Sequence, residues 1–143
     1  MDFIDLKKQQ ELIKNNIYDR ISKVLNHGQY ILGPEVKELE HELSLFSKSK
    51  YVLCCSSGTD ALLLSLISLG LKPNEGGIVP SFTFASTAEA VCMLGGVPFF
   101  SDVNIDTFNI CENSILNSIT EAKKQGVTLK VISSLKHVNY THI

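Results

Sequence analysis

A short polar turn between two apolar runs carries the residues best suited to holding an anion. Ser57, Gly58 and Thr59 lie between the apolar run 51–55 and the apolar run 61–69. A turn from a strand into a helix presents unpaired backbone N–H groups at the positive end of the helix dipole, where a phosphate binds well. Gly58 lets the backbone approach such a ligand closely, and the two hydroxyls can add hydrogen bonds. The alternative, that Ser57 or Thr59 only caps the helix, stays open.

A second polar stretch, residues 80–87, follows the next apolar run at 78–79. In an open parallel sheet, ligands bind at the carboxyl ends of the strands, so this stretch should reach the same edge as the first turn. Its two aromatic residues, Phe82 and Phe84, could stack on a flat ring. The alternative is that both phenylalanines pack in the hydrophobic core.

Several other kinds of site are excluded by what the sequence lacks. The turn at 56–59 has neither the lysine of a Walker loop nor the spacing of a dinucleotide-binding glycine motif. No serine-hydrolase elbow of the form GxSxG occurs. No arginine follows Cys54 and Cys55 at the helix start, so a cysteine phosphatase would lack its anion-binding partner. The histidines do not pair with carboxylates at metal-ligand spacing, so we expect exposed or helix-capping histidines and no metal site.

Composition and charge narrow the class of protein further. The chain has 143 residues, 44% of them apolar, which is enough for a sizeable core. The formal net charge is −2, and the 13 basic residues include a single arginine, Arg20, so we expect no nucleic-acid surface and no polybasic membrane patch. No window is apolar over the roughly 18 residues of a membrane span, and the acidic start of the sequence leads us to expect no secretory signal. We expect the four cysteines to be reduced and buried, rather than paired in disulfides or bound to metal. Reduced cysteines favour a cytoplasmic location.

Periodicity predicts two helices before residue 50 and alternating strands and helices after it. Isoleucines at helical spacing predict a first helix over 8–25, ended by Gly28, and Gly33-Pro34 opens a second helix. We therefore expect an N-terminal helical arm over 1–49 and a partial α/β domain over 50–143. The predicted strands are 51–55, 78–79, 97–103 and 127–132, and the predicted helices between them are 61–69, 84–94 and 112–124.

Strands separated by helices in this way form a parallel sheet with helices on both faces, which is an α/β fold. The adjacent glycines Gly76 and Gly77 precede the second predicted strand. Glycine weakens a strand interior, so we expect these two residues to shorten that strand.

Five ordered stretches of the sequence match a known family. They resemble the N-terminal part of the DegT/DnrJ/EryC1/StrS family, the pyridoxal-phosphate-dependent aminotransferases of nucleotide sugars. The matching stretches are 3–6, 27–36, 57–62, 80–89 and 100–103. The resemblance implies the N-terminal part of the large domain of a fold-type I aminotransferase. It further implies that the turn 57–59 holds the phosphate of pyridoxal 5'-phosphate and that Phe84 stacks on its pyridine ring. Gly28 and Tyr30 would contact the nucleotide sugar.

The resemblance also implies partners and an activity. The substrates would be a nucleotide-linked keto sugar and an amino donor, in the biosynthesis of surface polysaccharides and amino sugars, and the full-length enzyme would be a homodimer. The stretch 27–36 is most similar to enzymes acting on UDP-linked 3-keto-hexuronic acids. Aminotransfer needs a lysine that forms a Schiff base with the cofactor. No lysine of this chain lies in a stretch resembling that segment, so we expect an N-terminal fragment with no catalytic residue, inactive alone. The alternative is a non-catalytic, degenerate product or a module that pairs with an intact homologue.

Overall fold

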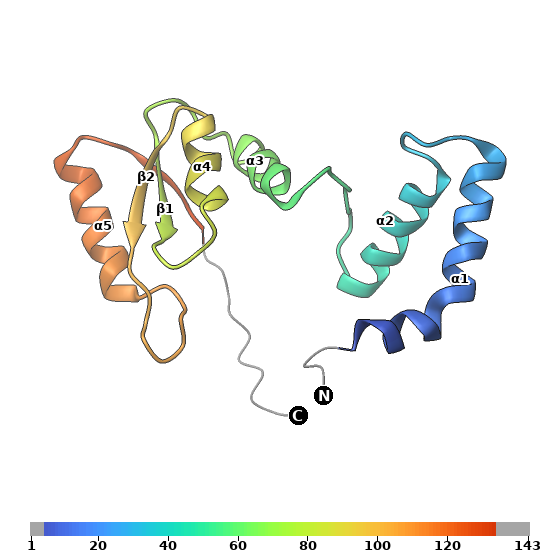
Figure 1. The fold of residues 1–143 in the computed structure, drawn as a ribbon. Coiled ribbons are helices and arrows are strands. Elements are labelled where there is room, and N and C mark those ends of the chain that lie inside the picture. Colours follow the sequence, from blue (N-terminus) through green and yellow to red (C-terminus); the bar gives the residue numbers. More distant parts are fainter. Residues whose placement is uncertain (1–4, 134–143) are drawn as a thin grey trace. The chain divides into compact units, whose positions relative to one another are not determined.

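The computed structural model describes residues 5–133, and these fall into two compact units that meet between Cys54 and Cys55. The N-terminal unit contains α1 (Leu6–His27) and α2 (Pro34–Ser47). The C-terminal unit contains α3 (Gly58–Ser68), β1 (Gly76–Pro80), α4 (Ser86–Met93), β2 (Val97–Ser101), α5 (Glu112–Lys124) and β3 (Leu129–Ile132) (Figure 1).

The two helices of the N-terminal unit begin and end where local chemistry predicts. The carboxylate of Asp5 accepts the N–H of Lys8 at 3.0 Å and caps α1. Gly28 ends α1 with a left-handed backbone (φ 68°), and its N–H donates to the carbonyl of Val24. Pro34 occupies the first helical position of α2, where its missing N–H costs nothing. The predicted helix ends are therefore confirmed to within about two residues.

The apolar stripe predicted along α1 lies exposed. Ile13, Ile17 and Ile21 keep 45%, 40% and 49% of their surface, and neither α1 nor α2 contains a buried residue. An amphipathic helix is stabilised mainly by burying its stripe against another element. Within the described part of the N-terminal unit no element covers this one.

The C-terminal unit is a parallel sheet with the strand order β2-β1-β3. In the central strand, Ile78 pairs with Phe99 of β2 and with Ile132 of β3. Helix α4 connects β1 to its parallel neighbour β2, and α5 connects β2 to β3, which pairs with the other edge of β1. The predicted α/β architecture is confirmed for this unit.

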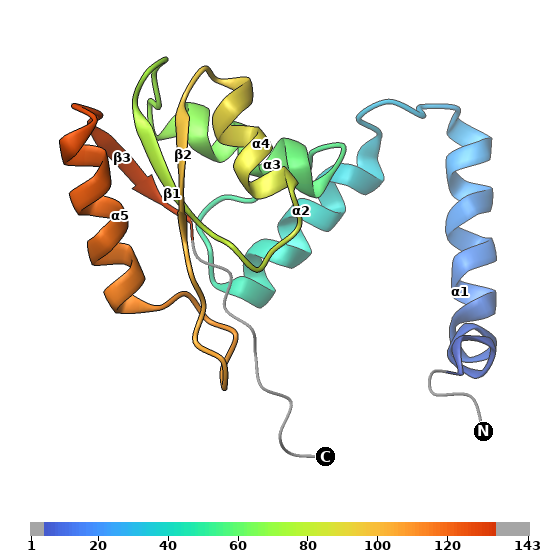
Figure 2. The same cartoon turned by 60° about the vertical axis from the view of Figure 1, so that its left-hand side comes forward.

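Both faces of the sheet are covered, α3 and α4 on one side and α5 on the other (Figures 1 and 2). Successive residues of β1 point to opposite faces. Val79 packs with Leu66 and Val91 under α3 and α4. Ile78, the preceding residue of β1, faces α5 and packs with Phe99 and Ala122. The middle strand is therefore buried over its whole length.

The predicted strand at 51–55 is wrong. These residues have no strand assignment, and no described residue pairs with them. The N–H of Cys54 donates instead to the Glu40 carboxylate at 2.9 Å, and Tyr51 and Leu53 are exposed. An apolar run becomes a strand only when a neighbouring strand takes up its backbone groups, and hydrophobicity alone cannot supply that partner.

Gly76 and Gly77 do not shorten their strand, because β1 begins at Gly76 and both residues are buried. A Cβ on Gly76 would lie 2.7 Å from Cδ2 of Leu129 and 3.0 Å from a ring carbon of Phe99. Side chains of the neighbouring strands already fill that space. The glycine is a packing requirement at the centre of the sheet.

The predicted burial of the cysteines is wrong in part. All four are free, as expected, but Cys55 and Cys92 are exposed and Cys54 and Cys111 are half-buried. The part of the chain that the structure describes contains no cluster of potential metal ligands. Among the described helices, none combines the length and the apolar character needed to cross a membrane.

Candidate functional site

The turn at 56–59 is the N-terminus of α3, with Ser57 as its cap. Ser57 has an extended backbone (φ −158°, ψ 167°), and its Oγ accepts the N–H of Asp60 at 3.1 Å. Its carbonyl accepts the N–H of Ala61 at 3.0 Å. The Ser56 hydroxyl donates to the Asp60 carboxylate. Ser57 therefore caps α3, and this cap uses only one of the free N–H groups of the first turn.

Two backbone N–H groups of this turn stay available. In the described part of the chain, the N–H groups of Gly58 and Thr59 have no hydrogen-bond partner. An ideal Cβ on Gly58 would meet no atom within 4 Å, and the backbone of Gly58 is not left-handed. These unpaired donors at the positive end of α3 fit the phosphate end of a cofactor.

Phe84 lies between the end of β1 and the start of α4 and is 78% exposed. Phe82 is also exposed, and its ring centroid lies 5.3 Å from that of Phe108. The core-packing alternative for this pair is therefore wrong. Phe84 lines a cavity of about 370 Å³, together with Pro80, Ser81, Thr83, Ala85, Ala88, Glu89, Cys92, Pro98 and Phe100. An exposed aromatic ring beside a cavity is available to stack on a flat ligand.

A polar pair at the carboxyl ends of β1 and β2 was missed in the sequence. The Ser81 hydroxyl donates to Oδ1 of Asp102 at 3.2 Å, and the N–H of Val103 donates to the same oxygen at 2.8 Å. The hydroxyl of Ser114, in the first turn of α5, accepts the N–H of Asp102 at 2.7 Å. These contacts tie the stretch after β1 to the stretch after β2. Ser81 directly follows β1 and Asp102 directly follows β2, whereas the predicted strand 97–103 had included Asp102. The available signal was that both residues lie near the carboxyl end of a predicted strand.

Gly28 and Tyr30 lie in the connector between α1 and α2, in the N-terminal unit. Tyr30 is 68% exposed and lines a cavity of about 380 Å³ with Arg20, Ile21, Val24 and Leu25. The left-handed backbone of Gly28 explains its glycine without any ligand. The structure thus groups residues 57–59 in one turn, places Phe84 in the same unit, and places Gly28 and Tyr30 in the other.

An ion pair and a hydrogen bond flank this connector. The guanidinium of Arg20 is hydrogen-bonded to the Glu38 carboxylate, which lowers the pKa of Glu38 and raises that of Arg20. Nε2 of His27 lies 3.0 Å from Oε1 of Glu35, and this hydrogen bond is the main cause of the lowered pKa of Glu35. Glu35 and Glu38 therefore link α2 to α1.

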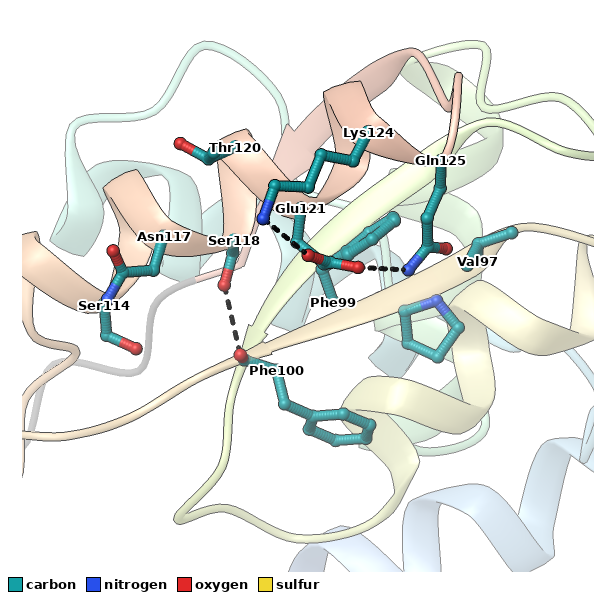
Figure 3. Close-up of a pocket in the computed structure, with 11 residues that line it drawn as sticks. Val97, Phe99, Phe100, Ser114, Asn117, Ser118, Thr120, Glu121, Lys124 and Gln125 are labelled. Atoms are coloured by element: carbon teal, nitrogen blue, oxygen red, sulfur yellow. Dashed lines mark hydrogen bonds and ion pairs between the residues drawn. The ribbon is translucent and has the colours of Figure 1, made fainter.

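A further cavity of about 500 Å³ lies between β2 and α5 and contains none of the predicted site residues (Figure 3). Its wall carries Glu121, whose carboxylate accepts from Gln125 at 3.0 Å and pairs with Lys124 at 3.7 Å. The Gln125 hydrogen bond and then the Lys124 charge lower the pKa of Glu121. The Ser118 hydroxyl donates to the Phe100 carbonyl at 3.1 Å. The chemistry of this cavity is that of a polar helix surface.

Comparison with known proteins gives consistent matches. The sequence model of the DegT/DnrJ/EryC1/StrS aminotransferase family matches residues 11–132. The chain is 45% identical over 124 residues to the UDP-2-acetamido-2-deoxy-3-oxo-D-glucuronate aminotransferase of Pseudomonas aeruginosa, covering 87% of this chain and 34% of that protein. A crystal structure of a DegT DnrJ EryC1 StrS aminotransferase from Brucella abortus matches with a TM-score of 0.87 at 41% identity, over 94% of this chain and 36% of that one.

NtdA from Bacillus subtilis, solved with its cofactor PMP bound, matches with a TM-score of 0.70 at 29% identity, over 80% of this chain and 32% of that one. The chain therefore spans about a third of the length of these relatives. The family match covers most of the chain and includes all six predicted site residues. The chain belongs to the DegT/DnrJ/EryC1/StrS aminotransferase family.

Proposed function

We propose that this chain supplies the phosphate-binding turn and part of the sugar-binding surface of an aminotransferase that acts on a nucleotide-linked keto sugar. The family depends on pyridoxal 5'-phosphate, and a structural neighbour carries the related cofactor PMP. The observation that carries the proposal is the turn before α3. It combines two unpaired N–H groups with a glycine that no contact within the chain requires.

The chain's own residues would divide the work of holding the cofactor. The N–H groups of Gly58 and Thr59 would donate to phosphate oxygens, and the Thr59 hydroxyl could add a third donor. Oγ of Ser57 accepts the Asp60 N–H and so shapes the turn, and its own O–H could still donate to the phosphate. Phe84 would stack on the pyridine ring. When bound, this cofactor supplies an electron sink for the transfer of the amino group.

The substrate proposed is a UDP-linked 3-keto sugar, with an amino donor as the second substrate. The support is the 45% identity to an enzyme named for a UDP-linked 3-oxo-glucuronate. Gly28 and Tyr30 would contact the nucleotide sugar. Their exposure, and the cavity of about 380 Å³ beside Tyr30, leave room for a ligand.

A homodimer and a cytoplasmic location complete the proposal. The exposed stripe of Ile13, Ile17 and Ile21 supports a second chain, because burial of such a stripe is what stabilises an amphipathic helix. Four cysteines without a disulfide support a reducing compartment. Light scattering over a concentration series tests the dimer, and a monomer at every concentration would contradict it.

The phosphate-binding turn can be tested by an NMR titration of the chain with pyridoxamine 5'-phosphate. This compound carries an amine, so it cannot form imines with surface lysines. We expect the amide signals of Gly58 and Thr59 to shift, and pyridoxamine without the phosphate to leave them unchanged. Equal shifts with the two compounds would overturn the proposal.

Two controls sharpen this titration. Gly58→Val places a side chain in the space where the phosphate would lie, and we expect it to abolish the shifts while the sheet signals stay unchanged. The first turn of α5, at Glu112 and Asn113, is a helix N-terminus without a glycine. Shifts there as large as those at Gly58 would indicate nonspecific attraction to helix dipoles.

A further inference from the structure

The connector between α1 and α2 is held at both ends by one imidazole ring. Nδ1 of His27 accepts the N–H of Gln29 at 3.0 Å. Because this nitrogen acts as the acceptor, a neutral ring carries its proton on Nε2. Nε2 can then donate to Oε1 of Glu35, which lies 3.0 Å away. The ring thus joins the end of α1, the connector and the first turn of α2.

The backbone of the connector needs such a restraint. Gly28 and Leu32 both have left-handed backbones, with φ of 68° and 49°. A leucine adopts this conformation only when its surroundings hold it there. Gly33 closes the connector so tightly that a Cβ on it would lie 2.4 Å from the Gln29 carbonyl oxygen. The chain therefore follows one defined path between the helices.

We propose that His27 is a positioning residue, whose neutral ring sets the backbone path of the connector and so the placement of Gly28 and Tyr30. The link to the nucleotide sugar rests on the proposed function, whereas the ring state and the connector path do not. A ring protonated on both nitrogens cannot accept from the Gln29 N–H, so protonation would release the connector while keeping the bond to Glu35.

The charged surroundings of the ring come from both helices. Glu35 of α2 hydrogen-bonds the ring, and Arg20 of α1 acts on the charge of Glu35, while Glu38 and Lys23 act on each other. The connector itself contributes Tyr30 as its one titratable side chain. Arg20 is engaged by Glu38, which leaves Glu35 as the hydrogen-bonding partner of the ring.

Two substitutions separate the two hydrogen bonds of the ring. His27→Asn keeps an oxygen near the position of Nδ1, so it can accept from Gln29 but cannot reach Glu35. His27→Gln reaches toward Glu35 but places no acceptor at Gln29. His41→Gln is the matched control, because the His41 side chain is exposed and makes no hydrogen bond in the described part of the chain.

The test is NMR of the full 143-residue chain. We expect the His27 ring as the Nε2–H tautomer, and a Gln29 amide signal that shifts in His27→Gln but not in His41→Gln. Hydrogen exchange at Gln29 should quicken about threefold to tenfold in His27→Gln, as loss of one hydrogen bond implies, and change little in His27→Asn and His41→Gln. A neutral His27 ring with its proton on Nδ1, or a Gln29 amide that is unaffected by His27→Gln, would overturn the proposal.

A second measurement separates this inference from the proposed function. UDP-N-acetylglucosamine is titrated into the wild type and the two His27 variants while the Gly28 and Tyr30 amides are followed. Weaker binding in His27→Gln, with recovery in His27→Asn, supports the positioning role. If the wild type does not bind the probe at all, the sugar assignment fails, and the tautomer and exchange results still decide the role of His27.

Discussion

The two units of the chain present opposite cases of how glycine and apolar residues are used. In the C-terminal unit, Ile78 and Val79 are fully buried in the middle strand of a covered sheet. In the N-terminal unit, Ile17 is 40% exposed and no residue of either helix is buried. The C-terminal unit has its own hydrophobic core, whereas the apolar stripe of the N-terminal unit is left exposed. Amphipathic periodicity shows that a face will be buried, but not by what.

The glycines of the chain also differ in whether the fold itself requires them. Gly28 is needed because its backbone is left-handed, and Gly76 because neighbouring side chains crowd it. Gly58 has neither reason, since its backbone is ordinary and its surroundings are open. A glycine that the chain does not need for itself fits the close approach of an outside group. For this reason the turn before α3 is a stronger candidate for a ligand site than the connector that contains Gly28.

The largest expected effect is the difference in stability between removing a buried isoleucine of the C-terminal unit and an exposed one of the N-terminal unit. Ile78→Ala removes a fully buried side chain and should destabilise the C-terminal unit by about 2–5 kcal/mol. Ile17→Ala trims a half-exposed side chain and should change stability by about 0.5 kcal/mol or less in the monomer. Urea unfolding, followed at amide signals of each unit, measures both. Equal losses would show that the stripe of α1 is covered in solution.

The next effect compares two glycines within one unit. Gly76→Ala forces a methyl group against Leu129 and Phe99 and should cost about 1–3 kcal/mol. Gly58→Ala meets open space and should change the free energy of unfolding by about 0.5 kcal/mol or less. Chemical denaturation of both variants checks this difference. A large loss in Gly58→Ala would mean that the chain itself requires the glycine, which removes the main support for a phosphate site.

A smaller effect concerns the two helix caps. Ser57→Ala removes the acceptor for the Asp60 N–H and should destabilise the C-terminal unit by about 1 kcal/mol. Ser57→Asp should keep the cap. Asp5→Ala removes the corresponding cap of α1, where we expect local fraying at the helix start and no change in the unfolding of the sheet. Thermal unfolding with amide exchange at both helix starts distinguishes these outcomes, and a global effect of Asp5→Ala would contradict the division into units.

The smallest effect is a pH dependence that should differ between units. Arg20 lowers the pKa of Glu38, and the hydrogen bond from His27 lowers that of Glu35. Their contribution is therefore fully present above the unfolded glutamate pKa of about 4.3 and is lost as pH falls through the lower folded values. Glu38 is exposed and Glu35 is partly exposed, so the change is slight.

An acid titration from pH 6 to pH 3, followed by NMR, measures this loss as loosening of α2 from α1. The Glu121 carboxylate also has a lowered pKa, but its partners Gln125 and Lys124 adjoin it on α5, so its protonation should separate no elements. Glu38→Gln should remove most of the dependence in the N-terminal unit. Loosening at high pH instead of low pH would reverse the assigned sign.

Local signals were enough to predict the helices and the parallel sheet. Gly28, Pro34 and Ser57 act on their own neighbours, so their effects on helix ends follow from sequence alone. The βαβ order likewise implied a parallel sheet, because parallel neighbours need a crossover. The same local logic predicted a candidate anion-binding turn at the start of α3, where two N–H groups have no partner among the described residues.

Tertiary structure alone decided the features that depend on distant partners. Residues 51–55 are not a strand here, because apolar content does not provide a pairing strand. Gly76 is buried because Leu129, more than fifty positions later, fills the space beside it. The links from Arg20 to Glu38 and from Ser81 to Asp102 span 18 and 21 positions, beyond any helical or strand period. Helix caps and helix ends depend only on residues a few positions apart in the sequence. The contacts named here form only after distant segments of the chain have come together.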